Sequence, residues 1–294
     1  AALKIRGGKG SQNTTLRMSA EGFNFEGALK TSDTGMIEGV RVNRLFLEDQ
    51  VNIRGELLRT ANGGLVIDVN GPFLNISPYL DGLMSSGEGT IPVFGDVKFL
   101  SRIDRLRLKD GLELTAVDLA ADFQGPILQS FSLKGKSVQG GAIDFQLQED
   151  AETKQRALTA TVADAGGLLQ GLLGTDFVTG GTLTATGTLS QSAEDKTKLL
   201  VRIKNARIKK APLLTQVLSL ASLRGLADVM NGDGILFTDV RLPLEIDAEG
   251  YYLDGAKASG PAMGFTTKGH ILNDGQKIAL DGVLVPSFGV NSAL

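Results

Sequence analysis

The feature that most constrains this chain is a strict alternation of apolar and polar residues. Leu65, Ile67 and Val69 point to one side of the predicted strand, and Asp68 and Asn70 point to the other. Successive side chains of a β-strand point to opposite faces, so this period predicts strands with one dry face and one wet face. The same pattern recurs along the chain in Ile143, Phe145 and Leu147, in Leu199, Val201 and Ile203, and in Val240, Leu242, Leu244 and Ile246.

Turn signals separate these segments. Glycine is abundant, with 38 residues against 8 prolines among 294. Asn62-Gly63-Gly64 and Asp110-Gly111 are typical of tight connections between antiparallel strands, and a bulge is expected between Leu114 and Val117. The sequence therefore predicts a mostly β fold of many largely antiparallel strands joined by tight turns.

Three short helices interrupt this pattern. Ser77-Pro78 can start one, and Ala165 to Leu173 can form a second. A third begins at Pro212 and places four apolar residues at helical spacing: Leu214, Val217, Leu218 and Ala221. Its apolar run is shorter than the ~20 residues that span a bilayer. The four residues are therefore interpreted as a helical plug or lid on an apolar surface, not as a membrane anchor.

The residues that carry most enzyme chemistry are scarce. The chain has no cysteine and one histidine, His270, which lies in a strand pattern without an identifiable partner. Asp233, in an Asn-Gly-Asp-Gly turn, lacks the further oxygen ligands of a calcium loop. The sequence therefore predicts no catalytic residues, no metal site, no cofactor and no enzymatic activity.

Charge narrows the range of partners. The formal net charge is −3 and the pI is near 5.4, which argues against a nucleic-acid binder. One basic stretch stands out: Lys196, Lys198, Arg202, Lys204, Arg207, Lys209 and Lys210. We interpret it as the solvated face of a strand, while attraction to anionic lipid head groups is the alternative interpretation.

The apolar face itself has two interpretations. It can be the interior of a closed sandwich or barrel, or the lining of an open trough that holds acyl chains. Both need one apolar face, so alternation alone does not separate them.

The region from Pro212 to Leu294 carries a resemblance to a known family. It contains "PLLTQVLSLASLRGLADVMNGDGILF", then "SGPAMGFTTKGHI", then "LDGVLVPSFGVNSAL". These pieces, in this order, resemble the C-terminal region of bacterial AsmA-like proteins, which include the YhdP-like and TamB-like bridge-type lipid transfer proteins. On this basis the fold is expected to be an elongated, twisted, mostly antiparallel β-groove, an open trough with an apolar interior and a few short helices, built from roughly 16 to 18 strands at about 4.8 Å per strand. Residues 1–210 are expected to form groove repeats with short helical insertions. Residues 211–294 are expected to form the AsmA-like segment, a helix plus closing strands continuous with the groove.

The resemblance implies a function and a location. The expected function is non-enzymatic transport of phospholipid between the inner and outer membranes of a Gram-negative envelope. The partners would be phospholipid acyl chains, one or both membranes and envelope proteins. The expected location is the periplasm, with an inner-membrane anchor in a segment outside this chain. The alternating residues above would line the path: Leu65, Ile67, Val69, Ile143, Phe145, Leu147, Leu199, Val201, Ile203, Val240, Leu242, Leu244 and Ile246.

Two other functions remain open. The chain can be an assembly or scaffold module that pairs a strand edge with a partner protein, as has been proposed for TamB-like proteins. It can also be a glycan-binding or glycan-active β-solenoid, although that would favour exposed aromatic platforms and paired carboxylates, and tryptophan is absent.

Overall fold

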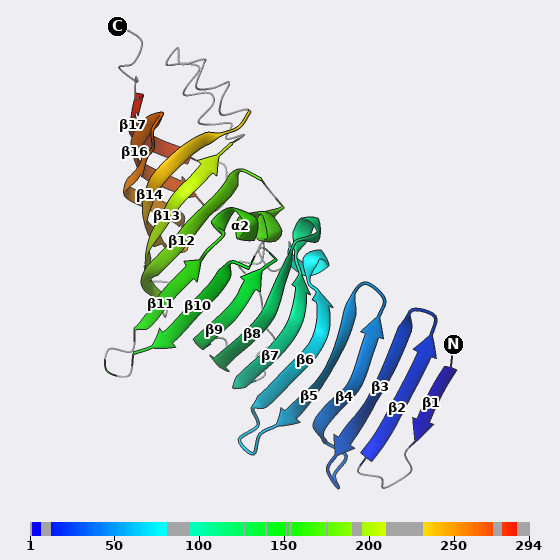
Figure 1. The fold of residues 1–294 in the computed structure, drawn as a ribbon. Helices are drawn as coiled ribbons and strands as arrows, with labels where there is room; N and C mark the ends of the chain where they lie inside the picture. The colour runs from blue at the N-terminus through cyan, green and yellow to red at the C-terminus, as the bar shows by residue number, and fades with distance from the viewer. Residues whose placement is uncertain are drawn as a thin grey trace, which may run out of the picture. The chain divides into compact units, whose positions relative to one another are not determined.

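The computed structural model describes most of the chain. The described residues are 2–6, 13–80, 95–125, 127–138, 140–150, 152, 155–174, 176–189, 196–209, 232–272 and 278–286. Most of them lie in β-strands. The chain divides into two compact units, Ala1–Gly140 and Gly141–Leu294, and each is a sheet in which strands follow one another in sequence order (Figure 1).

Unit 1 contains strands β1 to β9. Their bounds are β1 Ala2–Arg6, β2 Asn13–Ala20, β3 Phe23–Thr31, β4 Ile37–Leu47, β5 Val51–Arg59, β6 Leu65–Asn75, β7 Val97–Arg107, β8 Glu113–Gln124 and β9 Ile127–Ser137. Each strand pairs with the next, and all of these pairs are antiparallel except one.

The exception is the parallel pair β6–β7, with Leu65 opposite Val97 and Asn75 opposite Arg107. Parallel neighbours need a crossover rather than a hairpin. The crossover starts with the short 3₁₀ helix η1, Ser77–Tyr79, which carries Pro78 in its first turn. The side chain of Asn75 accepts hydrogen bonds from the Ser77 backbone N–H at 3.0 Å and from its hydroxyl at 2.6 Å. The predicted helix start at Ser77-Pro78 is confirmed.

Tight connections follow the predicted turn chemistry. The short 3₁₀ helix η2, Lys109–Gly111, joins β7 to β8, and Asp110 adopts a left-handed φ of 54° within it. The register between β8 and β9 shifts between Thr115 and Asp118, where Ala116 has a φ of 50°. Both the hairpin at Asp110-Gly111 and the bulge before Val117 are therefore confirmed.

Unit 2 contains strands β10 to β17 and helix α2. Their bounds are β10 Ala142–Glu149, β11 Arg156–Val162, α2 Ala165–Leu173, β12 Val178–Leu189, β13 Thr197–Ile208, β14 Ile235–Ile246, β15 Gly250–Ser259, β16 Met263–Leu272 and β17 Ile278–Pro286. All of its neighbouring strand pairs are antiparallel.

Helix α2 has the bounds that the sequence predicts. The Asp164 carboxylate caps its start by accepting from the Gly167 N–H at 3.0 Å, and Gly174 ends it in a left-handed conformation with φ 68°. A Cβ on Gly166 would lie 2.7 Å from Thr179 Cα. Glycine at this position therefore lets the helix approach the start of β12, and this contact supports a segment that its glycines would otherwise weaken.

Neither unit closes its sheet into a barrel. Among the described strands, β1 pairs only with β2 in unit 1, and β17 pairs only with β16 in unit 2. The predicted fold class is confirmed: mostly β, largely antiparallel and open. In the part of the chain that the structure describes, no helix combines the length and hydropathy needed to cross a bilayer. The predicted plug or lid residues Leu214, Val217, Leu218 and Ala221 lie outside the described residues, as does the boundary predicted at 210/211.

Candidate functional site

Cross-strand register collects the alternating apolar residues of unit 2 on one side of its sheet. Residues directly opposite each other in an antiparallel pair lie on the same face. Leu199 lies opposite Leu244, and Leu244 opposite Leu253. We call the result the apolar face of unit 2. Its main members are Ile143, Phe145, Leu147, Leu158, Ala160, Val162, Leu183, Ala185, Leu189, Leu199, Val201, Ile203, Val240, Leu242, Leu244, Ile246, Leu253, Phe265, Ile271 and Leu284.

This face is almost free of charge. In the described strands of unit 2, register places only Glu149 and Arg156 on it, directly opposite each other at the ends of β10 and β11. Away from that end, the charged residues of the same strands fall on the other side of the sheet. The face is therefore mainly apolar, and its two charged residues lie together at one end.

The apolar face of unit 2 is not a closed core. Of its ten residues predicted to line a lipid path, Ile143, Leu147 and Val240 are buried. The other seven are half-buried: Phe145, Leu199, Val201, Ile203, Leu242, Leu244 and Ile246. A sandwich or barrel interior would bury nearly all of them. The structure thus brings all ten together and leaves most of them within reach of a ligand.

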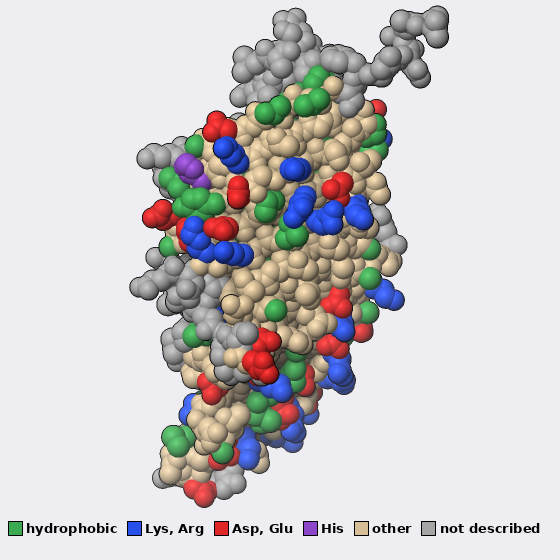
Figure 2. Space-filling model, turned by 90° about the vertical axis from the view of Figure 1, so that its left-hand side faces the viewer, with side chains coloured by type: hydrophobic (Ala, Val, Ile, Leu, Met, Phe, Trp, Pro, Cys, Tyr) green, Lys and Arg blue, Asp and Glu red, His purple; other side chains and the backbone are tan. Residues whose placement is uncertain are grey.

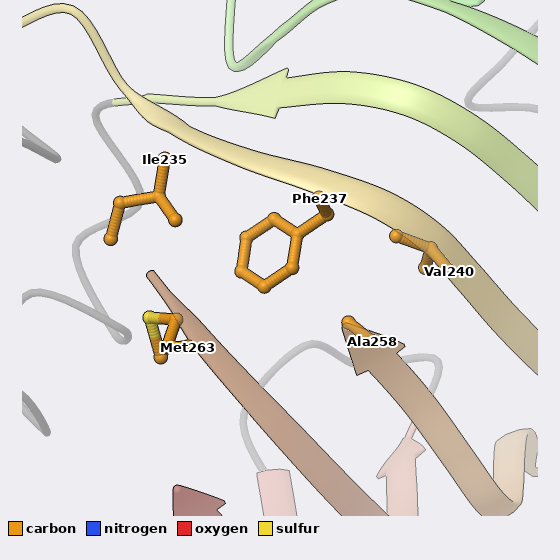
Figure 3. Packing of buried hydrophobic residues seen from close by; sticks show 5 residues of the cluster. All are labelled: Ile235, Phe237, Val240, Ala258 and Met263. Carbon is orange, nitrogen blue, oxygen red and sulfur yellow. The ribbon is translucent and has the colours of Figure 1, made fainter. Parts of the chain in front are cut away.

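One part of this face is tightly packed. Phe237 and Met263 are fully buried, and Ile235, Val240 and Ala258 complete a cluster in which the side chains point towards one another (Figure 3). The rings of Phe237 and Phe265 meet edge to face, with centroids 5.6 Å apart, a geometry that aromatic pairs favour. This cluster fixes the packing of β13 to β16.

The sequence prediction missed Ile235 and Phe237, because the alternation changes phase between them and Val240. The inward-facing positions switch from odd to even numbers near Asn205 on β13, which has a φ of 55°, and near Thr238 on β14. The two strands switch at the same level and therefore stay in register. On both strands, odd-numbered residues before the switch and even-numbered residues after it lie on the apolar face. The signal available in the sequence was the apolar alternation of Ile235 and Phe237 itself.

Unit 1 has an apolar face of its own. It contains the remaining predicted lining residues, Leu65, Ile67 and Val69, which are all half-buried. The residues opposite them on β5 and β7 include Leu57 and Phe99. In the described strands of this face, only Arg59 at the end of β5 is charged. The further members include Leu16, Phe25, Leu45, Ile53, Leu74, Ile103, Leu114, Val117, Leu119, Phe131 and Leu133.

The basic stretch of β13 lies on the opposite, polar face of unit 2. Lys196 donates to Glu245 at 3.2 Å, and Lys198 lies 3.6 Å from the same carboxylate. Arg202 lies 3.6 Å from Asp239. Lys204 and Arg207 occupy the same strand, with Arg207 donating to the Gly234 carbonyl at 3.2 Å. Lys209 pairs with Asp176 at 3.2 Å, and Lys210 lies outside the described residues. Figure 2 shows basic and acidic side chains next to one another on the face that it presents.

The ion pair between Lys196 and Glu245 shifts the pKa of both side chains. The hydrogen bond between them lowers the pKa of the Glu245 carboxyl and raises the pKa of the Lys196 ammonium group. Lys196 also lies 5.0 Å from the centre of the Tyr252 ring, and Tyr252 stacks at a tilt beside His270, with ring centroids 6.1 Å apart. His270 therefore lies beside the half-buried ring of Tyr252, its cross-strand neighbour on β15.

No group of three or more histidine, aspartate or glutamate side chains among the described residues is placed to hold a metal ion. Asp233 lies in a turn before β14. The absence of enzymatic activity and of a cofactor stays a prediction.

Comparison with known proteins does not place the chain in a family: no family model, curated protein or solved structure matches it.

Proposed function

We propose that the apolar faces of the two units bind phospholipid acyl chains, and that the protein carries phospholipid between membranes without covalent chemistry. The observation that carries this proposal is an apolar face in each unit that is charged only at strand ends, with most lining residues half-buried rather than sealed into a core. Such a surface is unusual for a protein in water unless a ligand or partner covers it.

The energetics favour acyl chains as the ligand. Exposing one CH₂ to water costs about 0.8 kcal/mol, so an acyl chain of about 16 carbons costs on the order of 13 kcal/mol. A protein surface that shields this chain removes most of the barrier to crossing an aqueous gap. The head group can stay in water at the edge of the face, so no buried charge is required.

The resemblance of residues 212–294 to AsmA-like proteins supplies the setting of the proposal. In that setting the gap is the periplasm of a Gram-negative bacterium, and the donor and acceptor are its inner and outer membranes. The partners would be these membranes and their phospholipids, with envelope proteins at the ends of the path.

A second function is favoured by the edge strands. Val283 and Val285 on β17 are 63% and 59% exposed, and Leu3 and Ile5 on β1 are 64% and 62% exposed. A long edge strand with exposed apolar side chains is a template for pairing with another strand. The alternative proposal is therefore an envelope assembly or scaffold module that binds a partner protein by strand addition.

Mass spectrometry of organic extracts from the purified chain separates the two proposals. Transport predicts co-purifying phospholipid, together with transfer of a fluorescent phospholipid from donor to acceptor vesicles. Assembly predicts protein without lipid, and a partner that protects β17 amides from hydrogen exchange.

The variant Leu244→Asp tests the site. Leu244 is half-buried and lies outside the packed cluster, so the variant is expected to fold, as far-UV circular dichroism can verify. A carboxylate beside acyl chains is costly, and we expect lipid binding to fall at least about tenfold. The matched variant Glu245→Gln, on the polar face, should bind normally. Unchanged lipid binding by a folded Leu244→Asp protein would refute the proposal.

A further inference from the structure

A hollow of about 570 Å³ lies on the polar face of unit 1. Six of its lining residues carry guanidinium or carboxamide groups: Asn43, Arg44, Asn52, Arg54, Asn70 and Arg102. They come from the four neighbouring strands β4 to β7. A smaller hollow of about 360 Å³ adjoins it and shares Asn43, Arg54 and Asn70.

Irregular backbone hydrogen bonding creates this hollow. The register between β4 and β5 shifts between Val42 and Leu45, and that between β5 and β6 shifts between Asn52 and Arg54. Gly71 of β6 lies beside the second of these shifts, and a Cβ on it would overlap the backbone carbonyl of Asn52 on β5. Bulges re-aim side chains and are enriched next to binding sites. Here two of them lie in the neighbouring pairs β4–β5 and β5–β6, beside the concavity.

Arginines outnumber carboxylates among the described residues that line the hollow. Three of these residues are arginines, and only Asp104 carries a carboxylate. The side chain of Arg54 makes no ion pair or hydrogen bond with the described part of the chain. Two further carboxylates lie close by. Asp68 accepts from Asn70, and Asp118 pairs with Arg102 at 3.2 Å through side chains that are 79% and 58% exposed.

The three arginines are placed to act together. Arg54 lies opposite Asn70, and Asn70 lies opposite Arg102, which forms one row across β5, β6 and β7. The guanidinium of Arg44 lies 5.5 Å from the centre of the Phe46 ring, a contact that restricts its side chain. Guanidinium groups thus reach the hollow from three strands, with carboxamide donors among them.

We propose that this hollow binds a phosphate group. Several guanidinium groups from different strands suit an anion with three or more oxygens, because each can donate two parallel hydrogen bonds to a pair of oxygens. Carboxamide N–H groups can donate to the remaining oxygens. A phosphate has more acceptor oxygens and more negative charge than a carboxylate, so it can engage more of these donors. The site lies on the face opposite the apolar one, so the inference does not depend on lipid transport.

The phosphate group can belong to a small molecule or to a lipid head group, and the experiment distinguishes these sources. The full chain is titrated calorimetrically with inorganic phosphate and with glycerol 3-phosphate, at constant ionic strength set by chloride. In parallel, it is sedimented with vesicles of phosphatidylcholine, with or without phosphatidic acid. A soluble ligand predicts saturable calorimetric binding without vesicle binding, whereas a head-group ligand predicts binding that requires phosphatidic acid.

Three variants test the site itself. Arg54→Gln should weaken phosphate binding by about tenfold, because a charge-assisted donor is lost. Asp104→Asn should strengthen binding about two- to fivefold, because a repelling carboxylate is neutralised. Lys98→Gln removes one positive charge from the polar face of the same strand as Arg102, outside the hollow, and should leave affinity unchanged.

Weaker phosphate binding by Arg54→Gln, stronger binding by Asp104→Asn and unchanged binding by Lys98→Gln would together identify a specific site. Equal effects of Arg54→Gln and Lys98→Gln would show attraction to net charge alone and overturn the proposal. The absence of saturable binding to phosphate, glycerol 3-phosphate and phosphatidic acid vesicles would also overturn it.

Discussion

Strands β1 to β6 and strands β13 to β16 share one sequence pattern but differ in packing. No hydrophobic side chain of the described strands β1 to β6 is buried, and residues such as Phe25 and Ile67 stay half-exposed. In β13 to β16, by contrast, Phe237, Ala256 and Met263 have no exposed surface. Alternation therefore specifies which side of a sheet is apolar, but not whether that side becomes a core.

The difference arises from irregularities in β13 to β16. Register shifts by one residue between Arg241 and Leu244 and again between Leu253 and Ala256, where Gly255 has a φ of 75°. Bulges increase local twist and bend the strands that carry them. Such bending brings Phe237, Met263 and Phe265 into contact. Unit 1 also has bulges, but its shifts in β4 to β6 open a polar hollow on the other face.

The largest expected effect comes from removing the ring at the centre of the packed cluster. Phe237→Ala should destabilise β13 to β16 by about 3–5 kcal/mol, through lost burial and a residual cavity. Phe25→Ala, in the open part of unit 1, should cost only about 1–2 kcal/mol, because its ring is partly exposed already. Hydrogen exchange measured by mass spectrometry resolves the two regions within the intact chain.

Comparable destabilisation by the two variants would contradict the distinction between a packed and an open apolar face. A larger effect of Phe25→Ala would show that unit 1, not unit 2, contains the tighter core.

An intermediate effect is expected where strands approach closely on the apolar faces. A Cβ on Gly187 of β12 would overlap the Lys198 carbonyl of β13, so Gly187→Ala should destabilise unit 2 by about 1–3 kcal/mol. Gly135, on the apolar face of unit 1, has its nearest neighbours at 3.5 Å, an ordinary contact. Gly135→Ala should therefore be neutral or slightly stabilising. Urea midpoints of the two variants provide the test, and equal losses would contradict the predicted difference.

The smallest effect concerns the polar face. The hydrogen bond from Lys196 lowers the pKa of Glu245, so the folded state favours the ionised carboxylate. The resulting stabilisation is present above the unfolded pKa and is lost as pH falls through the folded pKa. Both side chains are exposed, so the effect is small. In Lys196→Met, the NMR-detected pKa of the Glu245 carboxyl should rise. An unchanged pKa would show that the ion pair does not persist in solution.

Sequence patterns predicted the strands, helix α2 and the shared face of residues such as Leu199 and Leu244, because each depends on local spacing. They did not predict the parallel pair β6–β7, since the long connection between Asn75 and Val97 permits either strand direction. They also missed Phe237, because a phase change near Thr238 hides its alignment with Val240. The hollow around Arg54 depends on bulges in neighbouring strands, and no single segment of sequence reveals it.

The central claim is that the apolar faces contact acyl chains, and site-specific photocrosslinking tests it most directly. A photoreactive amino acid replaces Leu244 or Ile67 on the apolar faces, or Glu245 or Asp68 on the polar ones, and the protein is incubated with radiolabelled phospholipid vesicles. The account predicts strong lipid labelling from positions 244 and 67, and little from 245 and 68. Equal labelling from both faces, or none from positions 244 and 67 in folded protein, would contradict it.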